Sequence, residues 1–344
     1  MDADKSLSVV NQNAITISVP LNITISLGGM PTAPPVTGKV SPSAVAAPQE
    51  KVPVMAPNLG ERKGYQANFL SFGEVPLPEL TDEGMKNVAK LEDGSHVLHY
   101  TKFSLVMHKK RRLAMFTAAN VDWRDEKRKI NGKKPTRKKL NGFTGNERED
   151  WVTDPRILFD HQLPDHFFMK DGGAFDRGHL VRRDDVAWGD SFKEMQNGNG
   201  DTFHTTNCSP QVADFNQSRF SDFNWGALEN MVQKQSKTER VCVLAGPVFS
   251  EDDKFFDGFV KSGVPVSVQI PEAYWKIIIA QENGHPQAYG FILDQDLAPV
   301  NLHAEFVVPD AWKNLMVPIQ EIEDLMGGLF SFGIIKQWDQ HEDA

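Results

Sequence analysis

Short runs of β-type residues separated by turn signals make up most of the chain after Gly60, and this pattern limits the fold more than any other feature. Such runs predict strands, because β-branched and aromatic residues favour extended backbone while Gly, Pro and Asn favour turns. Helical spacing occurs at 225–235 and 319–326. Neighbouring strands with few helices between them favour an α+β domain over a doubly wound one. We expect strands at 97–106, 113–119, 173–181, 202–208, 241–248, 264–270, 274–280 and 287–293.

The first sixty residues follow a different pattern. Every odd position from Ile15 to Leu27 is apolar and every even position is Thr, Ser, Pro or Asn, which predicts a strand with one buried face. Pro20 cannot donate a ladder hydrogen bond, so this is an edge strand or two short strands. The strand can pair with its own domain, with a second copy in a homodimer or oligomer, or with a partner's sheet edge. We expect a strand arm at 1–30, a Pro- and Ala-rich linker at 31–59, a globular domain at 60–338 and an acidic tail at 339–344.

The composition is that of an ordinary soluble globular protein, with 40% hydrophobic and 24% charged residues. No apolar run reaches the ~18 residues that a membrane span needs, and the acidic N-terminus lacks a secretory pattern. The two cysteines, Cys208 and Cys242, lie in strand-like segments, where buried free thiols are more common than a disulfide. These features predict a cytoplasmic protein.

Charge is distributed unevenly along the chain. The net charge of −9 argues against a polyanionic partner, but residues 124–139 contain nine Lys or Arg against Asp125 and Glu126. With the cations from Lys109 onwards, this basic segment is compatible with salt-sensitive contact to a phosphate backbone. A solvated lysine-rich loop explains the segment equally well when it is taken alone.

The stretch from Phe175 to Arg183 holds residues suited to phosphodiester hydrolysis. His179 has an imidazole that, at its ordinary pKa of roughly 6.5, accepts a proton at neutral pH. Arg177 projects to the same face of a strand and supplies positive charge, while Gly178 leaves room for substrate backbone. Mg²⁺ keeps most of its waters and needs few protein ligands, so a single amide oxygen such as that of Asn216 suffices.

Several motifs accompany this stretch at specific spacing. They are Asp176-Arg177-Gly178-His179, Asn207-x-x-Pro210-Gln211, Asn216-Gln217, Trp225-x-x-Leu228-Glu229, Trp151-x-x-Asp154-Pro155 and the segment 243–248. The combination closely resembles the DNA/RNA non-specific endonucleases of the ββα-metal superfamily, which include bacterial sugar-non-specific and mitochondrial endonucleases. The resemblance spans 60–338 and implies a central antiparallel sheet flanked by helices, together with dependence on Mg²⁺, for which Mn²⁺ or another divalent ion can substitute.

The resemblance implies catalytic roles for three residues of the first motif. His179 is similar to the general base that activates water for in-line attack. Arg177 is similar to the arginine that binds the scissile phosphate. Asp176 matches an acidic residue, for which we expect a positioning role. Enzymes of this kind leave 5′-phosphate and 3′-hydroxyl ends.

The resemblance also implies a metal side of the site. Asn216 resembles the sole direct ligand, Asn207 an asparagine that supports the site, and Glu229 a helix glutamate that holds metal-bound waters. Asn216 and Glu229 are thirteen residues apart, further than in most relatives, and that length of helix would turn by about 220° and rise about 20 Å. We therefore expect Asn216 in a loop before a helix that has Asp222 as its N-cap. Asn224 is the competing ligand.

A second departure concerns a substrate-binding arginine. Relatives often carry it two residues before the Trp of the Trp-x-x-Asp-Pro motif, where this chain has Glu149. We expect Arg148 to replace it. Arg182 and Arg183 follow the histidine and are further candidates for phosphate contact, with an ordinary surface position as the alternative.

Other histidines have simpler interpretations. His161, Asp165 and His166 lie near Pro164, and a solvated loop explains them better than a metal cluster does. His204 lies beside the motif strand and suits either a structural role or a substrate contact.

These features predict a Mg²⁺-dependent endonuclease that cleaves double- and single-stranded DNA, and RNA, with little sequence preference, because phosphates carry no sequence information. One alternative is a catalytically idle nucleic-acid-binding or scaffold module, and another is a regulated effector nuclease of a defence or toxin system. The long basic segment disfavours a phosphodiesterase for small nucleotides or lipids. We expect the N-terminal strand and linker to restrain the nuclease by assembly, autoinhibition or recruitment.

Overall fold

The computed structural model describes residues 49–172, 174–236, 239–259, 266–294, 308 and 310–341. Contacts divide the chain after Ala47 into two compact units, and all described residues belong to the second unit, Pro48–Ala344. The amphipathic strand predicted at 15–27 and most of the predicted linker lie outside the described residues.

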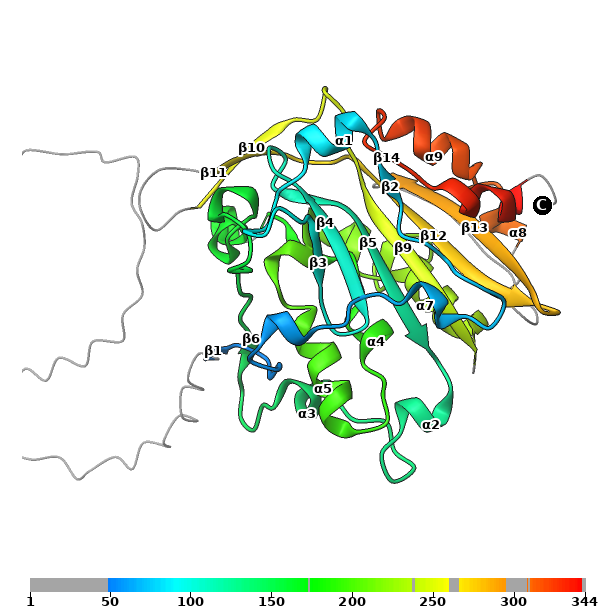
Figure 1. The fold of residues 1–344 in the computed structure, drawn as a ribbon. Helices are drawn as coiled ribbons and strands as arrows, with labels where there is room; N and C mark the ends of the chain where they lie inside the picture. The colour runs from blue at the N-terminus through cyan, green and yellow to red at the C-terminus, as the bar shows by residue number, and fades with distance from the viewer. Residues whose placement is uncertain are drawn as a thin grey trace, which may run out of the picture. The chain divides into compact units, whose positions relative to one another are not determined.

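A six-stranded antiparallel sheet forms the centre of this unit, in the order β13-β12-β9-β5-β4-β3. Figure 1 shows β5, β9 and β12 running through its middle. The sheet confirms the predicted α+β class with a central antiparallel sheet. Its strands are β3 (Val97–His99), β4 (Phe103–His108), β5 (Leu113–Asp122), β9 (Arg240–Val248), β12 (Ala273–Glu282) and β13 (His285–Asp294).

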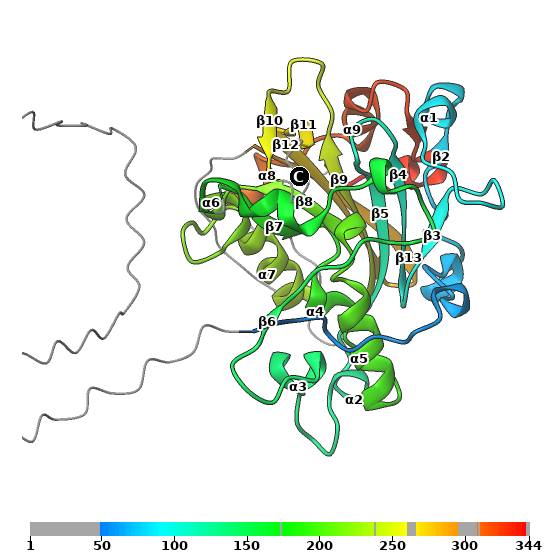
Figure 2. The ribbon, with the colours of Figure 1, turned by 90° about the vertical axis from the view of Figure 1, so that its left-hand side faces the viewer.

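Helices cover both faces of the sheet. One face packs against α4 (Arg183–Val186), α6 (Ala213–Asn216) and α7 (Trp225–Ser236), and Figure 2 shows α4 and α7 on the same side. The apolar residues that predicted α7 are buried on this face, so its helical period is explained by packing. The other face packs against α9 (Ile319–Leu325), the second predicted helix.

Shorter elements complete the described part of the unit. Its remaining helices are α1 (Asp82–Asn87), α2 (Asp125–Arg128), α3 (Arg137–Asn141), α5 (Phe192–Asp201) and α8 (Asp310–Lys313). Two-stranded sheets pair β1 (Glu50–Lys51) with β6 (Arg148–Glu149), β2 (Glu79–Leu80) with β14 (Phe330–Ser331), β7 (Asp176–His179) with β8 (Cys208–Gln211), and β10 (Phe255–Gly258) with β11 (Val266–Gln269).

Two of the predicted strands are wrong in extent. Within 97–106 the chain reverses, so that β3 and β4 pair with each other, and Lys102 takes a positive φ of 73° beside this turn. Most of 202–208 is not extended, because polar side chains bond locally: the hydroxyl of Thr202 donates to Asn199 O at 2.7 Å. A 3-10 helix therefore occupies Thr205–Asn207, and the strand begins only at Cys208.

Many cations of the predicted basic segment 124–139 are paired within the fold. Instead of one loop, the segment contains α2 and α3, which are separated by turns. Arg128 is buried and stacks 3.9 Å from the Trp123 ring. The local excess of positive charge is therefore partly neutralised. Its ion pairs include Arg124–Asp122, Lys127–Asp190, Lys129–Asp125 and Lys134–Asp184.

Residues 49–59, which the sequence places in the linker, belong to the compact unit. β1 pairs in parallel with β6, with Glu50 opposite Arg148. Val54 then donates its backbone N–H to Asn141 O at 3.1 Å. The N-terminal part of the described chain thus runs along β6.

Both cysteines are buried free thiols, as predicted. Burial raises the pKa of Cys242 to about 12, so this thiol stays protonated. Within the described residues, no helix combines the length and apolarity that a membrane crossing requires.

Candidate active site

The predicted Arg-Gly-His strand is β7, which is held by antiparallel pairing with β8. Gly178 has no space for a side chain, because a Cβ there would lie 2.0 Å from Oε1 of Gln211 on β8. The expectation that Gly178 leaves room for substrate backbone is wrong, because Gln211 fills this space. Glycine at this position instead allows β8 to approach the strand that presents Arg177 and His179.

A polar cleft of about 730 Å³ gathers side chains from β1, β6, β7, α6 and α7, among other segments. Eight of the nine site residues predicted from the sequence line it, and Asn207 does not. The predicted residues in the lining are Arg148, Asp176, Arg177, His179, Arg182, Arg183, Asn216 and Glu229. Six others also line it: Glu50, Arg137, Glu149, Trp151, Phe203 and Gln217.

His179 is held between two aromatic side chains. Its ring centroid lies 4.6 Å from that of Trp151 and 5.3 Å from that of Phe203. Its Nε2 is buried and has no hydrogen-bond partner among the described residues. Burial, followed by the positive charge of Arg137 and two further arginines, lowers the pKa of His179 to about 3. The imidazole is therefore neutral at pH 7 and has a nitrogen able to accept a proton.

Arg177 is oriented by Asp165. Its Nε donates to Oδ1 at 2.5 Å and its Nη2 to Oδ2 at 2.9 Å, which fixes the plane of the guanidinium. The prediction that Asp165 is only part of a solvated loop is therefore wrong. The sequence gives no signal for this pair, since the two residues are twelve apart in an irregular segment.

Asp176 organises two amide side chains. Its Oδ2 accepts from Asn216 Nδ2 at 2.9 Å and from Gln217 Nε2 at 2.5 Å. With their nitrogens engaged, the amide oxygens are the atoms left for another ligand, and Mg²⁺ prefers oxygen donors. These residues fit a Mg²⁺ site. Among the described residues, no group of three or more His, Cys, Asp or Glu side chains could hold a metal, so such a site would use few protein ligands.

A helix break brings Asn216 and Glu229 into the same cleft. α6 ends at Asn216, and α7 begins nine residues later at Trp225. The thirteen-residue interval is therefore not continuous helix, as predicted from the spacing. The predicted loop position of Asn216 is wrong, because this residue ends the short helix α6. Glu229 lies in the second turn of α7 and lines the cleft with Asn216.

Asn224, not Asp222, is the N-cap of α7. Its Oδ1 accepts from Ala227 N at 2.9 Å, and its Nδ2 donates to Asp214 O of α6 and to Gln217 O, just after α6, at 2.7 Å each. All polar atoms of this buried side chain are thus engaged, and it does not line the cleft. This removes Asn224 as the competing metal ligand.

Glu229 has cations on two sides. Lys276 Nζ lies 3.3 Å from its Oε1, and Arg182 Nε lies 3.7 Å from its Oε2. Asp185 is also buried nearby, and burial followed by the negative charge of Glu229 raises its pKa above the usual range. Lys276 was not predicted as a site residue, although a single lysine inside the apolar run 274–280 was a visible signal.

The other wall of the cleft comes from β1, β6 and α3. Arg148 is exposed on β6 and lines the cleft, as predicted for a substrate contact. Arg137 of α3 lines it too, and its Nε donates to Glu149 Oε1 at 2.6 Å. Arg137 was not predicted as a site residue, because nothing distinguishes it among the nine cations of 124–139. Glu50 was not predicted either, because it falls in the predicted linker.

Comparison with known families decides what kind of protein has this cleft. The family model described as DNA/RNA non-specific endonuclease matches residues 80–334, well over half of the chain. The chain belongs to this family. The matched range contains all nine predicted site residues, as well as Arg137 and Lys276.

Individual relatives of this endonuclease-family chain match over shorter lengths. An uncharacterized protein, y4fB, from Sinorhizobium fredii is 32% identical over 80% of this chain and 40% of its own length. A mitochondrial nuclease 1 from Schizosaccharomyces pombe is 28% identical over 56% of each chain. Mitochondrial endonuclease G from Bos taurus is 30% identical over 46% of this chain and 48% of its own. The chain thus spans about half the length of these relatives.

Among solved structures, an EndoG/EndoGI complex matches with a TM-score of 0.49 and 17% identity. The match covers 76% of this chain and 89% of the other.

Two polar residues near the cleft have structural contacts instead. Asn207 is fully buried behind β7, where its Oδ1 accepts from Val181 N at 2.9 Å and its Nδ2 donates to Val181 O at 3.0 Å. It thereby fixes the backbone two residues after His179. His204 is buried against Tyr100, with ring centroids 5.0 Å apart, so the structural alternative for this residue agrees with its position.

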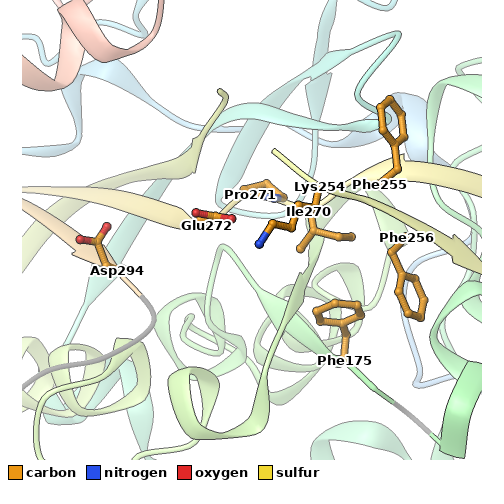
Figure 3. Close-up of a pocket in the computed structure, with 8 residues that line it drawn as sticks. All are labelled: Phe175, Lys254, Phe255, Phe256, Ile270, Pro271, Glu272 and Asp294. Atoms are coloured by element: carbon orange, nitrogen blue, oxygen red, sulfur yellow. The ribbon is translucent and has the colours of Figure 1, made fainter. Parts of the chain in front are cut away.

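A second pocket, of about 670 Å³, lies beside the β10–β11 hairpin (Figure 3). Phe175, Phe255 and Phe256 give it apolar walls. Its charged lining residues are Lys254, Glu272 and Asp294, so its net charge is negative and unsuited to a phosphate. It contains none of the predicted site residues.

Proposed function

We propose that this endonuclease-family chain hydrolyses phosphodiester bonds in double- and single-stranded DNA, and in RNA, with Mg²⁺ as cofactor, leaving 5′-phosphate ends. The observation that carries the proposal is the shared cleft. It combines a neutral histidine with an unpaired nitrogen, an oriented arginine, and an amide pair held by a carboxylate. These are a base, a phosphate-binding cation and a set of oxygen ligands.

His179 acts as the general base. Its imidazole takes a proton from the attacking water, and the low pKa keeps the ring neutral before attack. Trp151 and Phe203 hold the imidazole in place before substrate binds. Little entropy therefore has to be lost to orient the proton acceptor during the reaction.

Arg177 stabilises the negative charge that develops on the equatorial oxygens. Asp165 fixes the guanidinium before substrate arrives, so little reorganisation is needed in the transition state. Arg182 and Arg183 line the same cleft and add positive charge.

Asn216, Asp176 and Glu229 are the residues that would hold Mg²⁺, Asn216 directly and Glu229 through water. When bound, Mg²⁺ supplies Lewis-acid stabilisation of the leaving 3′-oxygen. The protein contribution is the fixed orientation of Asn216, whose amide nitrogen is engaged by Asp176.

The cleft also supports low sequence preference. Its lining is rich in charged groups of the kind that contact phosphates. Contacts of this kind position a nucleic acid without reading its bases.

The test is plasmid cleavage by His179→Ala in Mg²⁺. We expect a rate loss of about 100- to 10,000-fold, because general-base catalysis contributes that much. His285→Ala, an exposed histidine on β13 outside the cleft, is the matched control and should cleave like wild type.

Binding of a labelled duplex in EDTA separates the proposal from its main alternative. His179→Ala should bind as wild type does while failing to cleave. Wild-type protein that binds DNA but does not cleave it in Mg²⁺ would instead establish an idle binding module, and wild-type activity in the His179 variant would remove the proposed base.

A further inference from the structure

We propose that Arg137 of α3 is a substrate-phosphate-binding residue on the β6 wall of the cleft and that Glu149 positions it. This inference rests on the proposed function, because it assumes a phosphodiester in the cleft. Relatives often carry a substrate-binding arginine two residues before the Trp of the Trp-x-x-Asp-Pro motif, where this chain has Glu149. We infer that Arg137 takes the place of that arginine, and not Arg148, the residue expected from the sequence.

Glu149 is fixed from the protein interior. Its Oε1 accepts from Asn141 Nδ2 at 2.6 Å, and Asn141 Oδ1 in turn accepts from Asn199 Nδ2 at 2.8 Å. Asn141 and Asn199 are both fully buried. A chain of hydrogen bonds therefore runs from the core to one carboxylate at the cleft, and that carboxylate accepts from Arg137 Nε at 2.6 Å.

This arrangement holds Arg137 by one edge only. Its bond to Glu149 uses Nε, and its terminal nitrogens Nη1 and Nη2 have no hydrogen-bond partner in the described part of the chain. The side chain keeps 55% of its surface exposed. The guanidinium is thus oriented and still has donors to offer, which is the state that bidentate phosphate binding requires.

The other cleft arginines are more committed to protein partners. Arg177 is bound by Asp165 through two nitrogens, and Arg182 donates to Gln233 and Asn230. Arg183 is paired with Asp184. Arg148 lines the cleft, but no side-chain partner orients it among the described residues. Among these arginines, Arg137 is the one that is anchored through Nε alone and keeps both terminal nitrogens without a partner in the described residues.

Arg137 also lies close enough to the proposed base to affect it. After burial, its charge is the largest cause of the lowered pKa of His179. Arg137 and Arg177 thus bring positive charge to the same cleft from two segments, α3 and β7. β6 and α3 are neighbours in both Figure 1 and Figure 2, in agreement with the bond between Arg137 and Glu149. A phosphate bound in the cleft would be attracted by both cations.

Fold stability alone gives little reason for the Arg137–Glu149 pair. The Arg137 side chain is 55% exposed, so solvent screens the pair and its loss should hardly change unfolding. Measuring both thermal unfolding and activity therefore distinguishes a binding role of Arg137 from a structural one. Arg137→Ala should melt within a few degrees of wild type and still lose activity.

The experiment compares Arg137→Ala with Lys138→Ala, which removes the next cation of α3 from a position outside the cleft. We expect kcat/KM on a defined DNA duplex to fall about 10- to 100-fold in Arg137→Ala, as for the loss of a charged hydrogen-bond donor. Lys138→Ala should stay within about twofold of wild type, since an exposed charge away from the phosphate is screened. Glu149→Gln should lower kcat/KM by less than Arg137→Ala does. This variant keeps the guanidinium and weakens only the side chain that anchors it.

Two further variants complete the test. Arg137→Lys should recover only part of the activity, because an ammonium lacks the planar fork. The double variant Arg137→Ala with Glu149→Arg should recover activity by returning an arginine to β6. Equal losses in Arg137→Ala and Lys138→Ala would overturn the inference, as would wild-type kcat/KM in Arg137→Ala. If His179→Ala is inactive at the same time, the proposed function stands; if it is fully active, the proposed function fails.

Discussion

The ammonium of Lys276 lies 3.3 Å from Oε1 of Glu229 and 3.9 Å from the centre of the Trp225 ring, with almost no exposure to solvent. A lysine in the middle of a buried strand is costly unless it is paired. Here the pair connects the central sheet to the helix that carries Glu229 to the cleft. Lys276 is therefore a positioning residue for this carboxylate.

We predict that Lys276→Met lowers both stability and activity. Removing one partner of a buried ion pair costs about 3–5 kcal/mol, since the other charge is left without compensation. Urea unfolding measures this loss, and plasmid cleavage should fall because Glu229 loses its nearest cation. The double variant Lys276→Met with Glu229→Gln should regain stability while remaining impaired in cleavage. If the double variant is no more stable than the single one, the ion pair is not the source of the cost.

The pKa of His179 should depend on Arg137. The native value of about 3 comes first from burial and then from Arg137, so Arg137→Ala should raise it by removing a charge that opposes imidazolium formation. NMR titration of the histidine ring in metal-free protein measures the shift, and His179→Ala assigns the signal. The same titration of Lys138→Ala should leave the value near wild type. An unchanged pKa in Arg137→Ala would place Arg137 too far from the ring to act on it.

Site residues were predictable from the sequence where their spacing along one strand or helix determines which side chains lie together. Arg177 and His179 share one strand, so their side chains meet through the period of the strand alone. A helix break between Asn216 and Glu229 also followed from helix geometry, because a continuous helix could not bring both side chains to one cleft. The predicted break was correct, although its capping residue was not.

What the sequence could not provide were contacts between distant segments. Asp165 orients Arg177 from the start of a 3-10 helix twelve residues earlier, and Lys276 reaches Glu229 from a strand 47 residues away. Glu50 enters the cleft because β1 adds to β6, and nothing in a Pro-rich segment indicates such pairing. Gly178 was assigned to substrate because its true neighbour, Gln211, depends on the register of β7 with β8. These positions follow from tertiary packing, which local patterns do not encode.

Metal dependence should separate Asn216 from Asn224. EDTA should abolish cleavage by wild type, and Asn216→Ala should raise the Mg²⁺ concentration for half-maximal activity by about 10- to 100-fold, the range that loss of a metal-site partner produces. Asn224→Ala removes an N-cap, so it should lower stability by about 1 kcal/mol or more and leave the Mg²⁺ requirement unchanged. Cleavage rates over a Mg²⁺ titration and thermal unfolding measure the two effects. A raised Mg²⁺ requirement in Asn224→Ala alone would transfer the ligand role to Asn224.

Glu50 should weaken substrate binding. Its carboxylate lines the cleft among the arginines and is one of the charges that raise the pKa of Arg177, so it occupies space where a phosphate would be attracted. We predict that Glu50→Ala binds a labelled duplex about two- to fivefold more tightly in EDTA at low salt, and that the gain disappears as salt screens the charges. Glu126→Ala on α2, outside the cleft, should bind as wild type does. Weaker binding by Glu50→Ala would mean that β1 organises the cleft and does not oppose the substrate.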